Sequence, residues 1–141
     1  MNDTGPVLWR LIVVRFGEFQ QEILCGIFCW NDSSPTLTDC TVSDNTANAG
    51  GGIRCSGGSS PTISGCTISG NTANDHLGGG IYCQTFSSPT ITGCTISNNI
   101  GNFGGGIYCI ESSPTLTDCT ITNNTASEGG GGIYCRFDSN P

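Results

Sequence analysis

The chain has 141 residues, enough for one domain, and its composition is unusual for a globular protein because only 11% of residues are charged and 22 are Gly. Four arginines, no lysine and 11 carboxylates give a net charge of -7, so we expect no nucleic-acid partner and no docking on an anionic membrane. No apolar run approaches the roughly 18 residues that cross a bilayer, so we expect no membrane span in this chain.

Residues 1–25 stand apart from the rest of the sequence. The apolar run from Val7 to Val14 is interrupted by Arg10 and followed by Arg15, and no small-residue cleavage site comes after it. The run is therefore a poor match to a signal peptide. We expect an irregular N-terminal segment or cap over 1–25; a coil, a cap and translation from a misplaced start all remain open.

From residue 26 onward the sequence repeats. Four units cover 33–58, 59–86, 87–111 and 112–138, with lengths of 26, 28, 25 and 27 residues. Gly26-Ile27-Phe28-Cys29 matches the end of a preceding unit, and Ser139-Asn140-Pro141 begins a fifth. A repeat array that stops at this point leaves an open sheet edge. We therefore expect a chain truncated at its C-terminus, a fragment of a longer protein, with uncapped ends that allow end-to-end self-association.

Each unit has the composition of short strands and turns. Gly, Asn, Ser and Thr are poor residues for a pair of helices. Triplets such as Thr62–Ser64 and Thr90–Thr92 are rich in β-branched residues and are bounded by Pro, Gly or Asn, which predicts strands. Because the same strands recur once per unit without a crossover helix, they would stack in parallel. The sequence predicts an all-β fold, a parallel β-helix of about four full coils over 26–141 with partial coils at both ends.

One apolar pattern, I-x-x-C-x-I-x-x-N followed by a Gly run and I-x-C, recurs in every unit. We predict that its aliphatic positions face inward as stacked ladders: Leu37, Ile63, Ile91 and Leu116; Val42, Ile68, Ile96 and Ile121; Ile53, Ile81, Ile107 and Ile133. Buried asparagines must satisfy their amides, which can hydrogen-bond between coils about 4.8 Å apart. We predict such a ladder of Asn45, Asn71, Asn99 and Asn124. The Gly runs would supply unusual backbone angles at a tight corner.

The ten cysteines follow the same repeat. One column holds Cys29, Cys55, Cys83, Cys109 and Cys135, a second holds Cys40, Cys66, Cys94 and Cys119, and Cys25 is extra. Close Cys spacing occurs only at Cys25 and Cys29, and the chain has one His, so we expect no metal and no cofactor. Two interpretations remain open: thiols packed in the core, or a disulfide within each coil. The disulfides would join Cys55 to Cys66, Cys83 to Cys94, and Cys109 to Cys119.

The repeats resemble the right-handed parallel β-helix of pectin-lyase-like folds, which is found in many secreted and cell-surface proteins. The pairing of Gly-Gly-Gly-Ile with Ile-x-x-Asn, as at 104–107 and 96–99, is also similar to the GGA[ILV] and FxxN motifs of polymorphic outer-membrane proteins, a family of autotransporter adhesins. This chain has Gly where that family has Ala, and Val or Ile where it has Phe. The resemblance covers residues 26–141 and implies a right-handed coil and an extracellular or cell-surface location.

Catalysis on this type of fold requires carboxylates gathered on adjacent coils of one face. Asp39 and Asp118 share a column, but the two coils between them carry Gly there, and no neighbouring coils stack acids at an equivalent position in this alignment. Asp75 and His76 fall in the longest stretch before a Gly run, which we interpret as a solvated loop. We therefore predict no catalytic residue in this chain.

The outward positions of the first strand in each unit are hydroxyl-bearing. The candidate array consists of Thr36, Thr38, Thr62, Thr90, Thr92, Thr115 and Thr117. Stacked at strand spacing, it resembles the ice-binding face of β-helical antifreeze proteins. Thr is also a favoured residue on any solvated strand face, and both interpretations remain open.

From these features we expect a structural role: a stiff stalk or adhesive surface of a secreted or cell-surface protein, whose loops bind a carbohydrate or another cell-surface ligand. The alternative is a polysaccharide lyase or glycoside hydrolase whose catalytic coils lie elsewhere in a longer chain. Ice binding through the Thr array is the third hypothesis.

Overall fold

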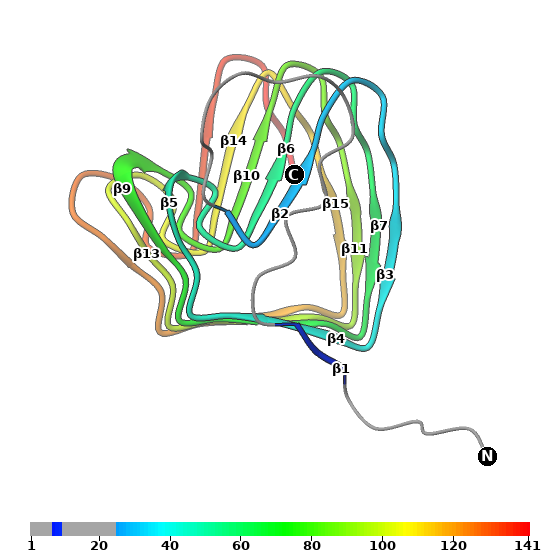
Figure 1. Cartoon of the computed structure of the whole chain (residues 1–141). Coiled ribbons are helices and arrows are strands. Elements are labelled where there is room, and N and C mark those ends of the chain that lie inside the picture. Colours follow the sequence, from blue (N-terminus) through cyan, green and yellow to red (C-terminus); the bar gives the residue numbers. More distant parts are fainter. Residues whose placement is uncertain (1–6, 10–24) are drawn as a thin grey trace.

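The structure is a computed structural model that describes residues 7–9 and 25–141, and the regular elements of this part of the chain are strands (Figure 1). They form four parallel sheets. Sheet 1 consists of β2 (Ile27–Cys29), β6 (Ile53–Cys55), β10 (Ile81–Gln84), β14 (Ile107–Ile110) and β18 (Ile133–Arg136). Sheet 2 consists of β3 (Thr36–Thr38), β7 (Thr62–Ser64), β11 (Thr90–Thr92) and β15 (Thr115–Thr117).

The other two sheets complete each coil. Sheet 3 consists of β1 (Val7–Trp9), β4 (Cys40–Ser43), β8 (Thr67–Ser69), β12 (Thr95–Ser97) and β16 (Thr120–Thr122). Sheet 4 consists of β5 (Thr46–Ala49), β9 (Thr72–Leu77), β13 (Ile100–Gly101) and β17 (Thr125–Ala126). The chain passes through sheets 1 to 4 in turn and then repeats the circuit, which confirms the predicted right-handed parallel β-helix of about four coils.

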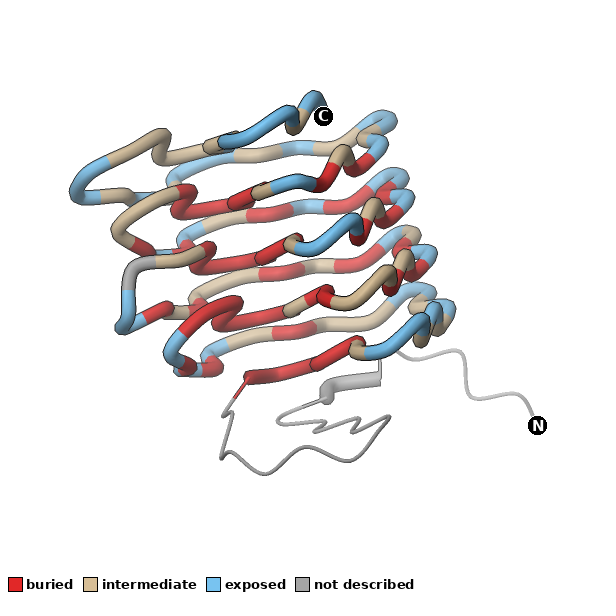
Figure 2. Tube along the Cα trace, turned by 90° about the horizontal axis from the view of Figure 1, so that it is seen from above, coloured by how far each residue is buried: buried red, intermediate tan, exposed pale blue. Residues whose placement is uncertain are grey.

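The coils stack residue on residue in register. Ile81 pairs with Ile53 on one side and with Ile107 on the other, and Ile107 pairs in turn with Ile133. The predicted aliphatic ladders fill the interior as a single core, and the central members such as Ile96 are completely buried. Figure 2 shows buried residues from the first described coil onward and few in the last one. In the last coil the core opens, and Ile133 is 37% exposed because no further described coil covers it.

The Gly runs have two physical functions, one of which the sequence did not indicate. The first Gly of three runs has a positive φ, 64° at Gly50 and 59° at both Gly78 and Gly104, as a tight corner requires. The later glycines are needed because adjacent coils approach closely. A Cβ on Gly80 would lie 2.6 Å from the carbonyl oxygen of Gly106 and 3.0 Å from Nδ2 of Asn99.

A second, smaller apolar cluster lies on the outward face of sheet 1. Tyr82, Tyr108 and Tyr134 are in register, and their successive ring centroids lie 5.4 and 5.6 Å apart. Leu77 and Phe103, from the bend between sheets 4 and 1, pack against them. Tyr82 and Tyr108 are consequently buried although they face away from the main core.

The interpretation of Asp75 and His76 as part of a solvated loop was wrong. Both residues lie within β9, which extends as far as Leu77. The strand is held because Leu77 pairs with Ala49 after a shift in register and also bridges to Phe103. The side chain of Asp75 is nevertheless exposed.

Part of the N-terminal segment joins the solenoid. β1 pairs in parallel with β4, Val7 opposite Cys40, and so adds one strand to sheet 3. Cys25 is buried with Phe28 and Ala47 in a cluster of its own. The predictions of a coil or cap over the remaining residues 1–6 and 10–24 fall outside the described part of the chain.

Candidate functional site

The turn between sheets 1 and 2 has an unusual backbone. In successive coils it places non-glycine residues at positive φ, with values of 54° at Thr85, 59° at Phe86 and 47° at Phe137. Gly57 and Gly58 occupy the turn one coil earlier, which is the residue type this conformation favours. A β-branched or bulky residue in the left-handed region is strained, and such strain is concentrated at functional sites. The residues at this turn are therefore not the ones that its backbone conformation favours.

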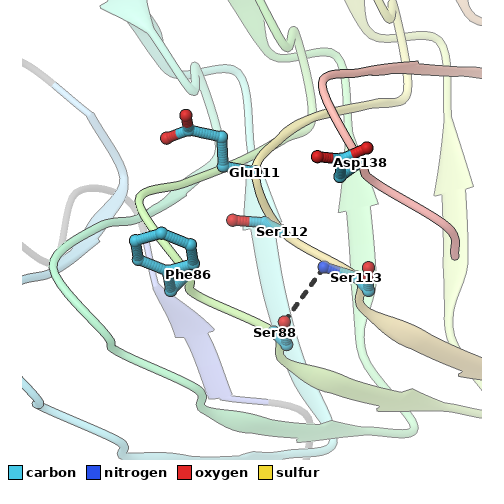
Figure 3. Close-up of a pocket in the computed structure, with 6 residues that line it drawn as sticks. All are labelled: Phe86, Ser88, Glu111, Ser112, Ser113 and Asp138. Atoms are coloured by element: carbon cyan, nitrogen blue, oxygen red, sulfur yellow. Dashed lines mark hydrogen bonds between the residues drawn. The ribbon is translucent and has the colours of Figure 1, made fainter.

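A surface hollow of about 370 Å³ lies at this turn in the last coils. It is lined by Phe86, Ser88, Glu111, Ser112, Ser113 and Asp138. Figure 3 shows the Phe86 ring and the Glu111 carboxylate on one side of the hollow and Asp138 on the other. The Phe86 side chain is 75% exposed, so its ring is presented to solvent instead of to a core.

The floor of the hollow is held by serines of the Ser-Ser-Pro segment. The backbone N–H of Ser113 donates to Oγ of Ser88 at 3.0 Å, and the N–H of Ser88 donates to Oγ of Ser60 at 2.9 Å. These two bonds run toward the preceding coil. The first serine of the segment bonds toward the following coil instead: the backbone N–H of Ser87 donates to Oγ of Ser112 at 3.1 Å. Sequence analysis missed this function, although both serines recur at the start of every unit. These bonds link the turns of consecutive coils and keep the hollow rigid.

Two carboxylates line the hollow from adjacent coils. Glu111 and Asp138 are the last residues of the third and fourth units, and the backbone N–H of Glu111 donates to the carbonyl oxygen of Phe137 at 3.1 Å. The expectation that no neighbouring coils stack acids was therefore wrong. The third unit is one residue shorter at this turn than the second. Columns counted forward from the start of each unit therefore miss the pair, although both acids directly precede the first serine of the following unit.

The chemistry of the hollow is suited to hydroxyl groups. Among the described residues no group of three or more His, Cys, Asp or Glu side chains is placed to hold a metal ion. Two carboxylates accept hydrogen bonds from hydroxyls, and an exposed aromatic ring offers an apolar face to the C–H groups of a sugar. The arrangement can therefore hold a polyhydroxylated ligand on a rigid turn.

A family comparison agrees with this architecture. The family model described as "right handed beta helix region" matches residues 13–141. The chain belongs to this family. Searches of curated proteins and of solved structures gave no match. Both enzymes and non-enzymes contain this β-helix domain, so membership assigns no activity.

The Asn ladder of this β-helix protein is structural. Each Asn from Asn71 onward accepts, at Oδ1, both the backbone N–H and the Nδ2–H of the Asn in the preceding coil. Nδ2 of Asn99 also donates to the carbonyl oxygen of Ile68 at 2.9 Å. The amides of Asn71 and Asn99 are fully buried and occupied by these bonds, so they cannot serve a ligand at the same time.

The predicted Thr array lies on the outward face of sheet 2, and the aliphatic residue between the two outward positions of each strand faces the core. Register pairing aligns one column of Thr36, Thr62, Thr90 and Thr115, and a second of Thr38, Ser64, Thr92 and Thr117. The threonines of both columns are exposed, whereas Ser64 is half-buried and its Oγ lies 3.3 Å from Oγ1 of Thr38. The β-helix thus presents two parallel rows of hydroxyl and methyl groups.

The cysteines contact one another between coils and not within them. All ten are free, so the predicted pairs Cys55–Cys66, Cys83–Cys94 and Cys109–Cys119 are not formed. In-register stacking instead places each thiol beside its counterpart in the next coil, and the Cys83 thiol is in hydrogen-bond contact with those of both Cys55 and Cys109. In the second column Cys66 is in such contact with Cys94. These hydrogen bonds, then burial, raise the pKa of Cys83 well above its usual value.

None of the described residues forms a helix long and apolar enough to cross a membrane.

Proposed function

We propose that this β-helix is a non-catalytic, structural and adhesive segment of a secreted or cell-surface protein, and that the hollow at Phe86, Glu111 and Asp138 binds a neutral carbohydrate. The observation that carries the proposal is the hollow itself: a strongly exposed aromatic ring beside two carboxylates, on a strained turn fixed by serine hydrogen bonds. An exposed ring on a rigid support binds a sugar face with little loss of side-chain freedom.

Charge favours a neutral ligand over an acidic polysaccharide. The hollow contains two carboxylates, neither of which forms an ion pair within the described residues, and the whole chain has a net charge of -7. A uronic-acid polymer would add like charges to this site, which costs free energy unless a cation intervenes. A hollow of about 370 Å³ fits about one or two sugar rings, so an affinity in the millimolar range is expected for a single site.

Binding is tested by titrating the ¹⁵N-labelled chain with neutral oligosaccharides and, separately, with oligogalacturonate. We expect chemical-shift changes at residues 86–88, 111–113 and 138 with a neutral sugar and none with the acidic one. Phe86→Ala and Glu111→Gln should each weaken binding at least tenfold. Ile100→Ala is the matched control because Ile100 is an exposed apolar residue of sheet 4, 51% accessible and outside the hollow. Equal binding by Phe86→Ala would contradict the proposal.

The same experiment addresses the enzymatic alternative. A lyase or hydrolase would release new sugar ends from a polymer, and that release would fall when Glu111 or Asp138 is changed to its amide. We expect no product from polymers that bind. Turnover that depends on these two carboxylates would replace the adhesive proposal with a catalytic one.

Ice binding is a second candidate, favoured by the two aligned Thr columns on sheet 2. It predicts thermal hysteresis in solutions of the purified protein. Thr90→Tyr, in the middle of the array, should abolish hysteresis, whereas Thr125→Tyr on sheet 4 should leave it unchanged. Absence of hysteresis in the unmodified chain would remove this candidate.

A further inference from the structure

We propose that Asn123 is an acceptor for an N-linked oligosaccharide, attached through its Nδ2 atom. Three observations support this assignment: Asn123 opens an Asn-x-Thr triplet that ends at Thr125, the side chains of both residues lie on the solvent side of one corner, and the Asn123 amide is free of bonds within the described residues. The biological setting rests on the proposed secreted or cell-surface location, whereas the capacity to accept a glycan and still fold rests on these residues.

The triplet itself is the first observation. Asn-x-Ser/Thr, with x other than Pro, is the acceptor sequence for N-glycosylation. In this chain it begins at Asn2, Asn31 and Asn123. Asn2 lies outside the described residues, and Asn31 has Gly beside it in the next coil. We restrict the proposal to Asn123 because the neighbouring coil has Asn98 at the same corner, followed two residues later by Ile100 instead of a hydroxyl residue.

The corner between sheets 3 and 4 places the triplet on two sides of the wall. Asn123, with a φ of 53°, is exposed, and so is Thr125. Asn124 between them belongs to the Asn ladder, where its Oδ1 accepts from Asn99. The amide that would receive the sugar and the hydroxyl that completes the triplet are therefore both on the outside of the solenoid.

The exposure of Asn123 is a property of the corner and does not depend on its position in the last coil. Asn98 occupies the same corner between two described coils, and it is exposed with nearly the same φ, 56°. Ile100, opposite Thr125 in the pairing of β13 with β17, is 51% exposed. A further coil stacked on the solenoid would therefore leave both outward positions of the triplet accessible.

The Asn123 amide differs from the ladder amides in its bonding. Within the described residues its side chain has no hydrogen-bond partner, so attaching a sugar to Nδ2 breaks no contact of the fold. By contrast, Nδ2 of Asn99 donates to Oδ1 of Asn124 and to the carbonyl oxygen of Ile68. None of the four ladder residues opens a triplet, because Ala or Gly stands two positions later. The sequence thus separates the amides that connect the coils from the amide that a glycan can occupy.

The transfer step requires a donor, an oligosaccharide linked through a diphosphate to a polyprenol lipid. Nδ2 of Asn123 attacks C1 of the first sugar, and a C1–N bond forms as the bond from C1 to the diphosphate oxygen breaks. The polyprenyl diphosphate leaves with the electron pair of that bond, and the amide gives up one proton to a base of the transferase. No group is oxidised or reduced. The product is a neutral amide that retains one N–H.

Acceptor capacity is tested on the full chain, diluted from urea into a reaction with purified oligosaccharyltransferase and a lipid-linked oligosaccharide. Peptide N-glycosidase in H₂¹⁸O then converts each occupied Asn to ¹⁸O-labelled Asp, which mass spectrometry locates, and a reaction without transferase measures spontaneous deamidation. We expect label at Asn123 at least tenfold above that at Asn98. Thr125→Val should abolish the label at Asn123, whereas Thr122→Val, an exposed Thr directly before the triplet, should not. No transfer to Asn123, or equal transfer to Asn98, would overturn the proposal.

Ile100→Thr provides the reciprocal test, because it completes a triplet that begins at Asn98. This variant should gain label at Asn98 and keep the label at Asn123. A variant that gains none would contradict the equivalence of the two corners, on which the accessibility of Asn123 rests.

Refolding tests whether the solenoid accommodates the glycan. The modified chain, separated from the unmodified chain on a lectin, should refold and should unfold at the same urea concentration. A modified chain that fails to refold, or that unfolds at a lower concentration, would show that Asn123 is packed in the folded state and would overturn the proposal. The corner is remote in sequence from Phe86, and none of these readouts measures sugar binding in the hollow, so the two proposals fail separately.

Discussion

Oδ1 of Asn71 accepts two hydrogen bonds from Asn45, one from its backbone N–H at 3.1 Å and one from its Nδ2 at 3.0 Å. The same pair of bonds links Asn71 to Asn99 and Asn99 to Asn124. The corner between sheets 3 and 4 is therefore connected through side chains in addition to the backbone ladders on either side.

Replacing Asn99 with Ala should lower the free energy of unfolding by about 3–5 kcal/mol, because it leaves two buried donors of Asn71 without an acceptor. Asn98→Gly is the matched control. Asn98 is exposed, and its φ of 56° suits Gly, so a change below about 0.5 kcal/mol is expected. Urea unfolding of both variants measures the difference. Equal stabilities would show that the amide ladder does not hold the corner.

The Gly run yields a prediction about steric contact between coils. Gly80→Ala should destabilise the chain by several kcal/mol or prevent folding, because its Cβ would lie 2.6 Å from a carbonyl oxygen. Gly132 occupies the same column in the last described coil, where the nearest atom to a new Cβ is Cγ2 of Ile121 at 3.6 Å. Gly132→Ala should therefore change the melting temperature by no more than a few degrees. Similar losses in both variants would contradict the steric argument.

Strain at the hollow predicts a trade-off between stability and binding. Phe86→Gly should raise the free energy of unfolding by about 1 kcal/mol, because Gly adopts the φ of 59° without penalty and little packing is lost. The same variant should lose the sugar binding proposed above. Thermal unfolding and titration of one preparation test both parts. A less stable Phe86→Gly chain would mean that the ring packs in the folded state.

Tyr82 predicts a loss of stability at alkaline pH. Burial raises the pKa of Tyr82 to about 12, above the value of about 10 for an exposed phenol. The folded state therefore favours the neutral phenol, so this stability is complete below pH 10 and is lost as the pH rises from 10 to 12. The full loss is about 2–3 kcal/mol.

The comparison is between the unmodified chain and Tyr82→Phe, measured by urea unfolding at intervals from pH 9 to 12. The other titrating groups are common to both proteins, so their difference isolates Tyr82. The unmodified chain should become progressively less stable relative to the variant above pH 10. A difference that stays constant with pH would show that this phenol is solvated in the folded state.

The sequence predicts the β-helix and its inward face well, because every unit repeats the same residues at the same spacing. Ile96 and Asn99 could be placed on their ladders before the structure was known, since in-register stacking follows from repetition. The two functions of the Gly run could not be separated, because one depends on φ and the other on the distance between backbones. The stacked tyrosines were not predicted either, since their burial depends on where Leu77 and Phe103 pack.

The candidate site was missed for a different reason. It lies where the units differ in length, so columns counted forward from the start of each unit do not align Glu111 with Asp138, whereas counting back from the following serine would have done so. Cysteine contacts are likewise not encoded in spacing, because the sequence permits pairs within a coil and between coils equally well.

In-register stacking also restricts how this chain can carry charge. A carboxylate copied into the next coil would stand about 4.8 Å from its copy and repel it by about 1 kcal/mol in water. Asp39 and Asp44 avoid this because the next coil has Gly65 and Gly70 beside them. Neutral Thr, Asn and Gly columns can be extended coil by coil without such repulsion. A longer solenoid of these units would therefore have to stay weakly charged, and a pair such as Glu111 and Asp138 could be tolerated only locally.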